Sequence, residues 1–215
     1  MHDELNLGLF PINVVLFPFS KLPLYIFEER YKKLINESAE EGKLFGINLF
    51  ADKKIFNTGC SARVDKIINK NEKGEMNIIV SGIRRYKMIG YESGPEGYYI
   101  GKVNMTDDDN SDFDRVNAEK CVKIYNELVE IVYKGSVSKI YLNDIKWQSK
   151  SRSLSFAMAE KCGLRLLERQ NLLEIDSEDK RLDYLMKYFD EVFPKLKEAD
   201  RISGIIKSDG YIQQD

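Results

Sequence analysis

The spacing of apolar residues changes once along this sequence, and that change constrains the fold more than any other feature. Between about residues 5 and 105, apolar residues recur at period two, as at Met76, Ile78 and Val80. This spacing is typical of strands that bury one face. From about residue 115 the period becomes 3.6, which is typical of amphipathic helices. We therefore predict an α+β protein with a strand-rich first part and a helical second part.

The first part reads as short strands separated by Gly, Asn and Lys turns, which predicts a closed or nearly closed, mainly antiparallel β-barrel. The expected strands are 5–10, 44–50, 58–68, 75–81, 83–89 and 99–105. One helix, Glu28 to Glu41, interrupts them and stops at Gly42. Its apolar face contains Tyr31, Leu34 and Ile35 next to Ser38. We expect this helix to cap the barrel.

The apolar segment 7–35 cannot form one long strand or helix, because it contains Pro18 and Pro23. A proline has no amide hydrogen and a fixed φ, so it ends regular pairing or lies at its margin. We expect several short, bent, buried pieces there.

The helical part follows the acidic stretch 107–114. Its first helix ends at Gly135, and further helices are expected at 153–162, 166–173 and 179–193, the last ended by Pro194. The predicted buried stripe of the first helix is Cys121, Ile124, Tyr125, Leu128, Ile131 and Val132. The predicted division is a barrel at 1–106, an acidic linker at 107–114, a helical subdomain at 115–196 and a polar tail at 197–215.

Charge and cysteine content limit the compartment and the partners. Lysine and arginine (33) nearly balance aspartate and glutamate (35), so a net charge of -2 gives no long-range attraction to nucleic acid. Three cysteines without a C-x-x-C pair predict buried thiols in a reducing compartment. The acidic N-terminus is unlike a signal peptide, and no apolar run approaches the roughly 18 residues of a membrane span. We expect a cytoplasmic protein that does not bind membranes.

The sequence lacks the common catalytic signatures. The only histidine is His2, at the N-terminus, so a Ser-His-Asp or Cys-His site has no base in the expected fold. The sequence contains no Walker A loop, no G-x-G-x-x-G and no G-x-S-x-G. We predict no catalytic residue and no cofactor. A Ser-Lys pair formed in space, and with it a hydrolase, remains an open third hypothesis.

A calcium-loop pattern occurs in the acidic stretch but lacks its glycine. The ligand positions would be Asp108, Asn110, Asp112, Asp114 and Glu119. Phe113 stands where the loop needs glycine for its sharp turn. We predict no metal site, and a solvated acidic linker whose last acids favour a helix N-terminus.

Two charged clusters could be functional sites by composition, but their geometry indicates a structural role. Arg84 and Arg85 are adjacent in a strand, so they point to opposite faces and cannot form one nucleobase-binding patch. Glu28, Glu29 and Arg30 do not converge on a helix as a catalytic pair would. We predict structural ion pairs for Glu28, Arg30, Arg84 and Arg85.

The stretch LFPINVVLFPFSKLPLYIFEERYKKLI resembles the start of the N-terminal, substrate-recognition domain of Lon protease, with its pattern L-F-P-L, V-L-F-P and P-L-x-I-F-E-x-R-Y. The similarity continues through 44–50, 58–67, 77–88 and 166–189. The resemblance implies a PUA-like β-barrel followed by a helical bundle. A complete Lon protease carries an AAA+ ATPase and a Ser-Lys peptidase after this region, and the 215 residues contain neither. The resemblance therefore implies recognition without catalysis.

The first functional hypothesis is a non-catalytic module that binds unfolded or hydrophobic polypeptides, or an adaptor in protein quality control with a separate ATPase or protease as a partner. The residues proposed to bind polypeptide are Phe10, Phe17, Phe19, Leu22 and Tyr25. In the alternative hypothesis it is a PUA-like module for RNA or a small ligand, which the acidic pI and the split arginines disfavour. These apolar residues could equally all be buried or form a homodimer interface, and the sequence does not fix the oligomeric state.

Overall fold

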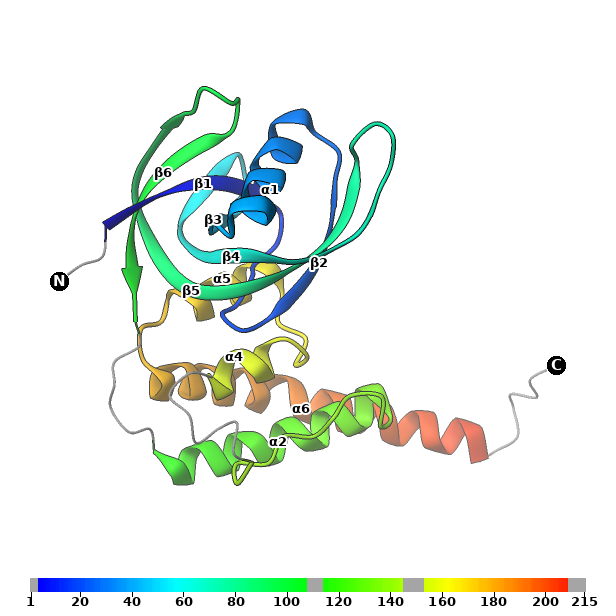
Figure 1. Cartoon of the computed structure of the whole chain (residues 1–215). Coiled ribbons are helices and arrows are strands. Elements are labelled where there is room, and N and C mark those ends of the chain that lie inside the picture. The colour runs from blue at the N-terminus through cyan, green and yellow to red at the C-terminus, as the bar shows by residue number, and fades with distance from the viewer. Residues whose placement is uncertain (1–3, 108–113, 145–152, 209–215) are drawn as a thin grey trace. The chain divides into compact units, whose positions relative to one another are not determined.

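The computed structural model describes residues 4–107, 114–144 and 153–208 (Figure 1). The chain forms two compact units. Unit 1 comprises Met1–Asn110 with Arg165–Asp176, and unit 2 comprises Ser111–Leu164 with Ser177–Asp215. Strands belong to unit 1 and most helical residues to unit 2, which confirms the α+β class.

A six-stranded sheet closes into the barrel of unit 1. The strands are β1 (Glu4–Ile12), β2 (Lys21–Ile26), β3 (Phe45–Ala51), β4 (Lys54–Lys70), β5 (Met76–Ser93) and β6 (Tyr99–Thr106). Their order is β2-β5-β4-β3-β1-β6, and an additional β5–β6 pairing closes the ring. The β1–β3 pair is parallel and the other pairs are antiparallel. The prediction of a mainly antiparallel barrel is confirmed.

Strand β5 is longer than the sequence suggested. The expected strands 75–81 and 83–89 are one strand that continues through Gly82. Its first half pairs with β2 and its second half with β6. A side chain at Gly82 would overlap the backbone carbonyl of Phe17. This glycine therefore permits a close backbone approach within a continuous strand, where we had expected a break.

Helix α1 (Glu29–Glu41) packs on the barrel core, and Gly42 ends it in the left-handed conformation at φ 66°. The predicted face is confirmed, because Tyr31, Leu34, Ile35 and Ser38 are all buried. The core beneath it contains large apolar side chains from the strands and from the proline-containing segment, among them Phe10, Leu16, Ile26, Phe45, Ile47, Met76, Ile78 and Val80.

Helix α5 (Leu166–Glu174) belongs to unit 1, whereas the sequence placed it in the helical subdomain 115–196. Gln170 Nε2 donates to the carbonyl oxygen of Thr58 at 3.1 Å. The buried Arg85 donates through Nη1 to the carbonyl oxygens of Leu173 and Ile175, both at 3.0 Å. Hydrophobic periodicity carries no information about such contacts. Whether the ranges 1–106 and 115–196 fold independently as domains remains a prediction.

Unit 2 contains α2 (Arg115–Tyr133), α4 (Leu154–Ala159) and α6 (Glu178–Ser208). The side chain of Asp114 accepts hydrogen bonds from the amides of Val116 (2.9 Å) and Asn117 (3.3 Å), which caps α2 as expected for the last acids of the stretch. The predicted stripe of α2 is correct at Cys121, Tyr125 and Leu128. It is wrong at Val132, which is exposed, while Val122 and Val129 are buried in addition.

The prediction that the last helix ends at Pro194 is wrong, because α6 continues through it to Ser208. Pro194 is exposed, so water can hydrogen-bond the carbonyl group that loses its helical partner. Residues 197–208, expected as a polar tail, are therefore helical. The linker residues 108–113, with the calcium-pattern residues Asp108, Asn110 and Asp112, and the segment 209–215 lie outside the described residues, as does His2.

The three cysteines, Cys60, Cys121 and Cys162, are buried free thiols, as predicted. Across the described ranges, no helix combines the length and the apolar content that crossing a bilayer requires.

The two adjacent arginines of β5 should differ in their effect on stability. Arg85→Met removes the hydrogen bonds that this buried side chain donates to the carbonyl groups of Leu173 and Ile175, so we expect the free energy of unfolding to fall by about 2–4 kcal/mol. Arg84 pairs with the exposed Asp107, and Arg84→Met should lower it by less than about 1 kcal/mol. Urea unfolding of both variants measures the difference. Equal losses would contradict this assignment.

Stability should fall in alkaline solution. Burial raises the pKa of Cys60 and of Cys121 from 9.0 to about 12. The fold therefore favours the protonated thiols, and this contribution, complete below pH 9, is lost as the pH rises from 9 toward 12. We expect the urea midpoint to drop between pH 8.5 and 10.5, and to drop less in Cys60→Ala. A midpoint with the same pH dependence in both proteins would refute the role of this thiol.

Candidate functional site

The structure separates the five residues that the sequence proposed for polypeptide binding. Phe10 and Phe17 are buried in unit 1, with 6% and 0% of their surface exposed. Leu22 packs against the core. Phe19 and Tyr25 are exposed by 52% and 53%. Only these last two are therefore placed to contact a partner.

Strand β2 and its flanking residues carry a row of exposed side chains, which we call the β2 surface: Phe19, Lys21, Pro23, Tyr25 and Phe27. They occupy every second position, and the residues between them are buried or half-buried. Within β2 the alternation follows from strand geometry, in which successive side chains point to opposite faces. Phe19 precedes the strand and is exposed at a turn residue with positive φ. The same period would have identified Phe27 from sequence, and it was missed because Pro18 and Pro23 suggested irregular pieces.

The two aromatic rings at the end of β2 support each other. The ring centroids of Tyr25 and Phe27 lie 5.9 Å apart in a stacked arrangement. Tyr25 Oη donates to the Glu75 carboxylate at 2.8 Å. Each residue is nevertheless more than half exposed. Large aromatic side chains that are held in place at a surface are suited to binding apolar groups.

The backbone edge of β2 offers little for strand addition. Among the described strands, β2 pairs with β5 alone, so its other edge is open. Pro23 lies in the middle of the strand, opposite Ile79 of β5. A proline is tolerated in an edge strand where its nitrogen faces away from the partner strand. An added strand would meet a missing donor at this point, so the side chains of the β2 surface are its stronger binding groups.

Phe19 adopts a backbone conformation that is rare for a bulky residue, with φ 66°. Its amide donates to the carbonyl oxygen of Gly82 at 2.8 Å, and the Gly82 amide donates to Ser20 at 2.9 Å. These two bonds hold the strained residue in place. Outliers of this kind persist where the surroundings fix them, and they concentrate at functional sites.

The predicted ion-pair residues have the following partners. Arg30 donates through Nε and Nη2 to one oxygen of Glu28, at 3.0 and 2.7 Å, with both side chains 41% exposed. Arg84 pairs with Asp107 on one side of β5, and Arg85 reaches the end of α5 on the other. The two arginines of β5 therefore do not form one cationic patch. That these pairs serve the fold alone remains a prediction.

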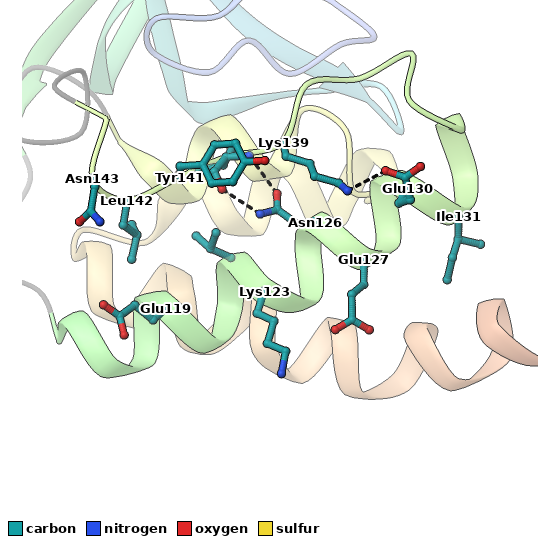
Figure 2. A pocket seen from close by; sticks show the side chains of 12 residues that line it. Glu119, Lys123, Asn126, Glu127, Glu130, Ile131, Lys139, Tyr141, Leu142 and Asn143 are labelled. Carbon is teal, nitrogen blue, oxygen red and sulfur yellow. Dashed lines mark hydrogen bonds and ion pairs between the residues drawn. The ribbon is translucent and has the colours of Figure 1, made fainter.

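A hollow of about 650 Å3 lies along α2 in unit 2 (Figure 2). The Asn126 side chain donates to the Ile140 carbonyl at 2.8 Å and accepts from the Ile140 amide at 2.9 Å. Lys139 pairs with Glu130 at 2.8 Å. These polar groups fasten the segment after α2 onto the helix, so the hollow is interpreted as a structural junction.

The comparisons with solved structures support the fold. The crystal structure of a Lon N-terminal domain protein from Xanthomonas campestris superposes with a TM-score of 0.66 at 21% identity. The N-terminal domain of Mycobacterium avium complex Lon protease superposes with a TM-score of 0.68 at 14% identity. Each alignment covers 86% of this chain and 98% of the other.

Curated relatives are Lon proteases of bacteria. Lon protease of Buchnera aphidicola subsp. Baizongia pistaciae is 22% identical over 207 residues, and Lon protease 2 of Syntrophobacter fumaroxidans is 24% identical over 204 residues. Both alignments cover 91% of this chain, which spans only about a quarter of the relatives' length, 26% and 25%. The family described as the substrate-binding domain of ATP-dependent protease La (LON) matches residues 6–191. With this match over most of its length, the chain belongs to the LON substrate-binding domain family.

Proposed function

We propose that this chain is a non-catalytic recognition module that binds exposed apolar segments of unfolded polypeptides through the β2 surface. The observation that supports this most is the exposed, stacked pair Tyr25 and Phe27 at the end of β2, with the exposed Phe19 just before the strand. Contiguous exposed apolar groups on a protein surface usually mark an interaction site. Family membership supports a polypeptide ligand, because the family is described as the substrate-binding domain of a protease.

The physical reason for low sequence specificity is the chemistry of the surface. Apolar contacts are non-directional and scale with the area removed from water. Pro23 weakens regular backbone pairing, so a bound segment would be held by its side chains.

We also propose that the chain acts in the cytoplasm and delivers polypeptides to a separate ATPase or protease. Three buried free thiols suit a reducing compartment. The named relatives are proteases four times as long, and the part that this chain matches is their substrate-binding domain. In this arrangement the chain would bind the substrate and the separate partner would supply the catalysis.

RNA binding is the alternative. It would need cations gathered on one face, and the adjacent arginines that the sequence offered are divided, with Arg84 on Asp107 and Arg85 buried. The net charge of -2 adds no long-range attraction. Polypeptide binding is therefore the function that the surface favours.

Removing the stacked rings should weaken polypeptide binding. We expect Tyr25→Ser with Phe27→Ser to lower the affinity for fluorescently labelled, reduced and carboxymethylated lactalbumin about tenfold or more, because two large apolar contacts are lost. Fluorescence anisotropy measures the affinity. Tyr141→Ser is the matched control, since Tyr141 is an equally exposed aromatic residue of unit 2.

Salt separates the two functions in the same assay. Polypeptide binding should persist at raised salt, whereas RNA binding falls steeply with it. A labelled RNA that binds at low salt and is released at high salt, beside no polypeptide binding at either, would refute the proposal in favour of the alternative.

The purified chain should hydrolyse neither ATP nor casein. A phosphate-cradling loop is absent from the sequence, and its one histidine is His2. Coupled phosphate release and casein cleavage are the measurements. Activity that co-purifies with the chain and disappears in a single serine or lysine variant would instead establish the Ser-Lys hydrolase.

A further inference from the structure

Unit 1 has a cavity of about 600 Å3 at the end of the barrel where the β3–β4 turn lies. Strands β1 and β3 run parallel and finish there, β4 and β6 begin there, and β5 ends there. The start of α1 closes one side. We call it the end cavity, and its lining includes charged and aromatic residues: Glu28, Arg30, Tyr31, Phe50, Lys53, Lys54, Tyr91 and Tyr99. The volume lies within the range of about 300–1,000 Å3 typical of ligand pockets.

Aromatic rings form much of this end cavity. Tyr31 is buried, whereas Phe50 and Tyr91 are exposed by 44% and 50%. Tyr91 and Tyr99 meet edge to face, with ring centroids 5.0 Å apart. Exposed rings around an opening can enclose an apolar or aromatic side chain from solution.

The charge of the end cavity is positive, although the whole chain is slightly acidic. Arg30, Lys53 and Lys54 contribute three positive charges, and Glu28 contributes one negative charge that pairs with Arg30. In the described residues, neither Lys53 nor Lys54 forms an ion pair; Lys54 Nζ lies 5.2 Å from the ring centroid of Phe56. Two lysine ammonium groups therefore remain for an anion from solution.

The turn that carries Lys53 is unusual. Asp52 and Lys53 both have positive φ, 52° and 61°, between the paired residues Ala51 and Lys54. Two-residue turns of this type prefer Asn-Gly or Asp-Gly, because only glycine has no steric penalty at positive φ. The chain keeps a lysine where glycine fits better, which suggests that the ammonium group serves a purpose other than stability.

We propose that the end cavity binds a carboxylate that lies next to an aromatic or large aliphatic side chain. Such a pair occurs at the C-terminus of a polypeptide and at an internal aspartate or glutamate beside an apolar residue. The rings would take the apolar side chain, and Lys53 and Lys54 would take the carboxylate. The inference rests on the proposed function, because it assumes that the ligand is a polypeptide.

A nucleotide fits this lining less well. Nucleobases are recognised by hydrogen bonds to their edges together with stacking. The side chains that line the end cavity, in the part of the chain that the structure describes, include no amide and no aliphatic hydroxyl. Glu28, which could accept from a base, already accepts two hydrogen bonds from Arg30.

The test compares three labelled hexapeptides by fluorescence anisotropy: one ending in Phe with a free carboxylate, its C-terminal amide, and an amide with an internal Asp-Phe pair. We expect the free acid or the internal Asp-Phe peptide to bind at least fivefold more tightly than the plain amide. The free acid as the tighter ligand identifies a chain end, and the Asp-Phe amide an internal acidic residue. Equal affinity of all three would overturn the proposal.

Lys53→Gly tests the site without harming the fold. Glycine suits the positive φ, so the thermal midpoint should not fall, while the advantage of the carboxylate peptide over the plain amide should shrink at least threefold. Lys120→Ala, a change at an exposed lysine of α2, should leave that advantage intact. An undiminished advantage in Lys53→Gly would overturn the assignment, as would displacement of the peptide by adenosine monophosphate at a lower concentration than by the unlabelled peptide.

The outcomes separate this inference from the proposed function. Loss of lactalbumin binding in the Tyr25 and Phe27 variant would support the β2 surface as a binding site. If the three hexapeptides then bind the wild-type chain equally, only the carboxylate site is refuted. If lactalbumin does not bind the wild-type chain but the carboxylate peptide does, the proposed function fails and the cavity assignment stands.

Discussion

The pairing of β5 with three other strands is the interaction on which unit 1 depends. Its first half holds β2, its second half closes the barrel through β6, and β4 runs along both. Gly82 lies between the two halves, where a side chain would overlap the carbonyl of Phe17. The carbonyl of the same glycine accepts a hydrogen bond from the Phe19 amide, and its amide donates to the Ser20 carbonyl. Closure of the barrel and the position of an exposed aromatic residue thus depend on one close backbone approach.

The path of β5 also explains why the proposed binding surface lies on β2. Because β5 turns from β2 toward β6 along its length, β2 is left at the edge of the sheet and outside the closed ring. An edge strand is open to aggregation by backbone pairing unless it is protected. Pro23 and Lys21 are residues that protect such edges. The aromatic side chains before and after these two residues, Phe19, Tyr25 and Phe27, can then be exposed without the strand itself acting as a template.

Much of the fold followed from periodicity, because burial of one face imposes a spacing on the sequence. The α1 face was predicted correctly, and so was the β5 face of Met76, Ile78 and Val80. Periodicity failed where it could not distinguish adjacent stripes, as on α2, where Val122 and Val129 are buried. It also failed at Pro194, where an exposed proline interrupts one hydrogen bond without ending the helix.

The candidate sites were harder to predict, for different reasons. Phe10 and Phe17 were assigned to binding because apolar composition does not distinguish buried from exposed residues, and both are in the core. Phe27 could have been found from period two if the prolines had been interpreted as edge-strand residues. The end cavity could not be found from sequence, because its walls come from five separate segments that only barrel closure brings together.

The two proposed contact regions meet in the chain at one short segment. Phe27 ends the β2 surface, and Glu28 and Arg30 line the end cavity at the start of α1. A polypeptide that reaches both would engage the second region as an intramolecular step, which raises the overall affinity without new contacts. The β2 surface would provide apolar affinity that tolerates many sequences. A carboxylate in the end cavity would add a directional, charge-dependent contact, so selectivity among unfolded chains would come from the end cavity.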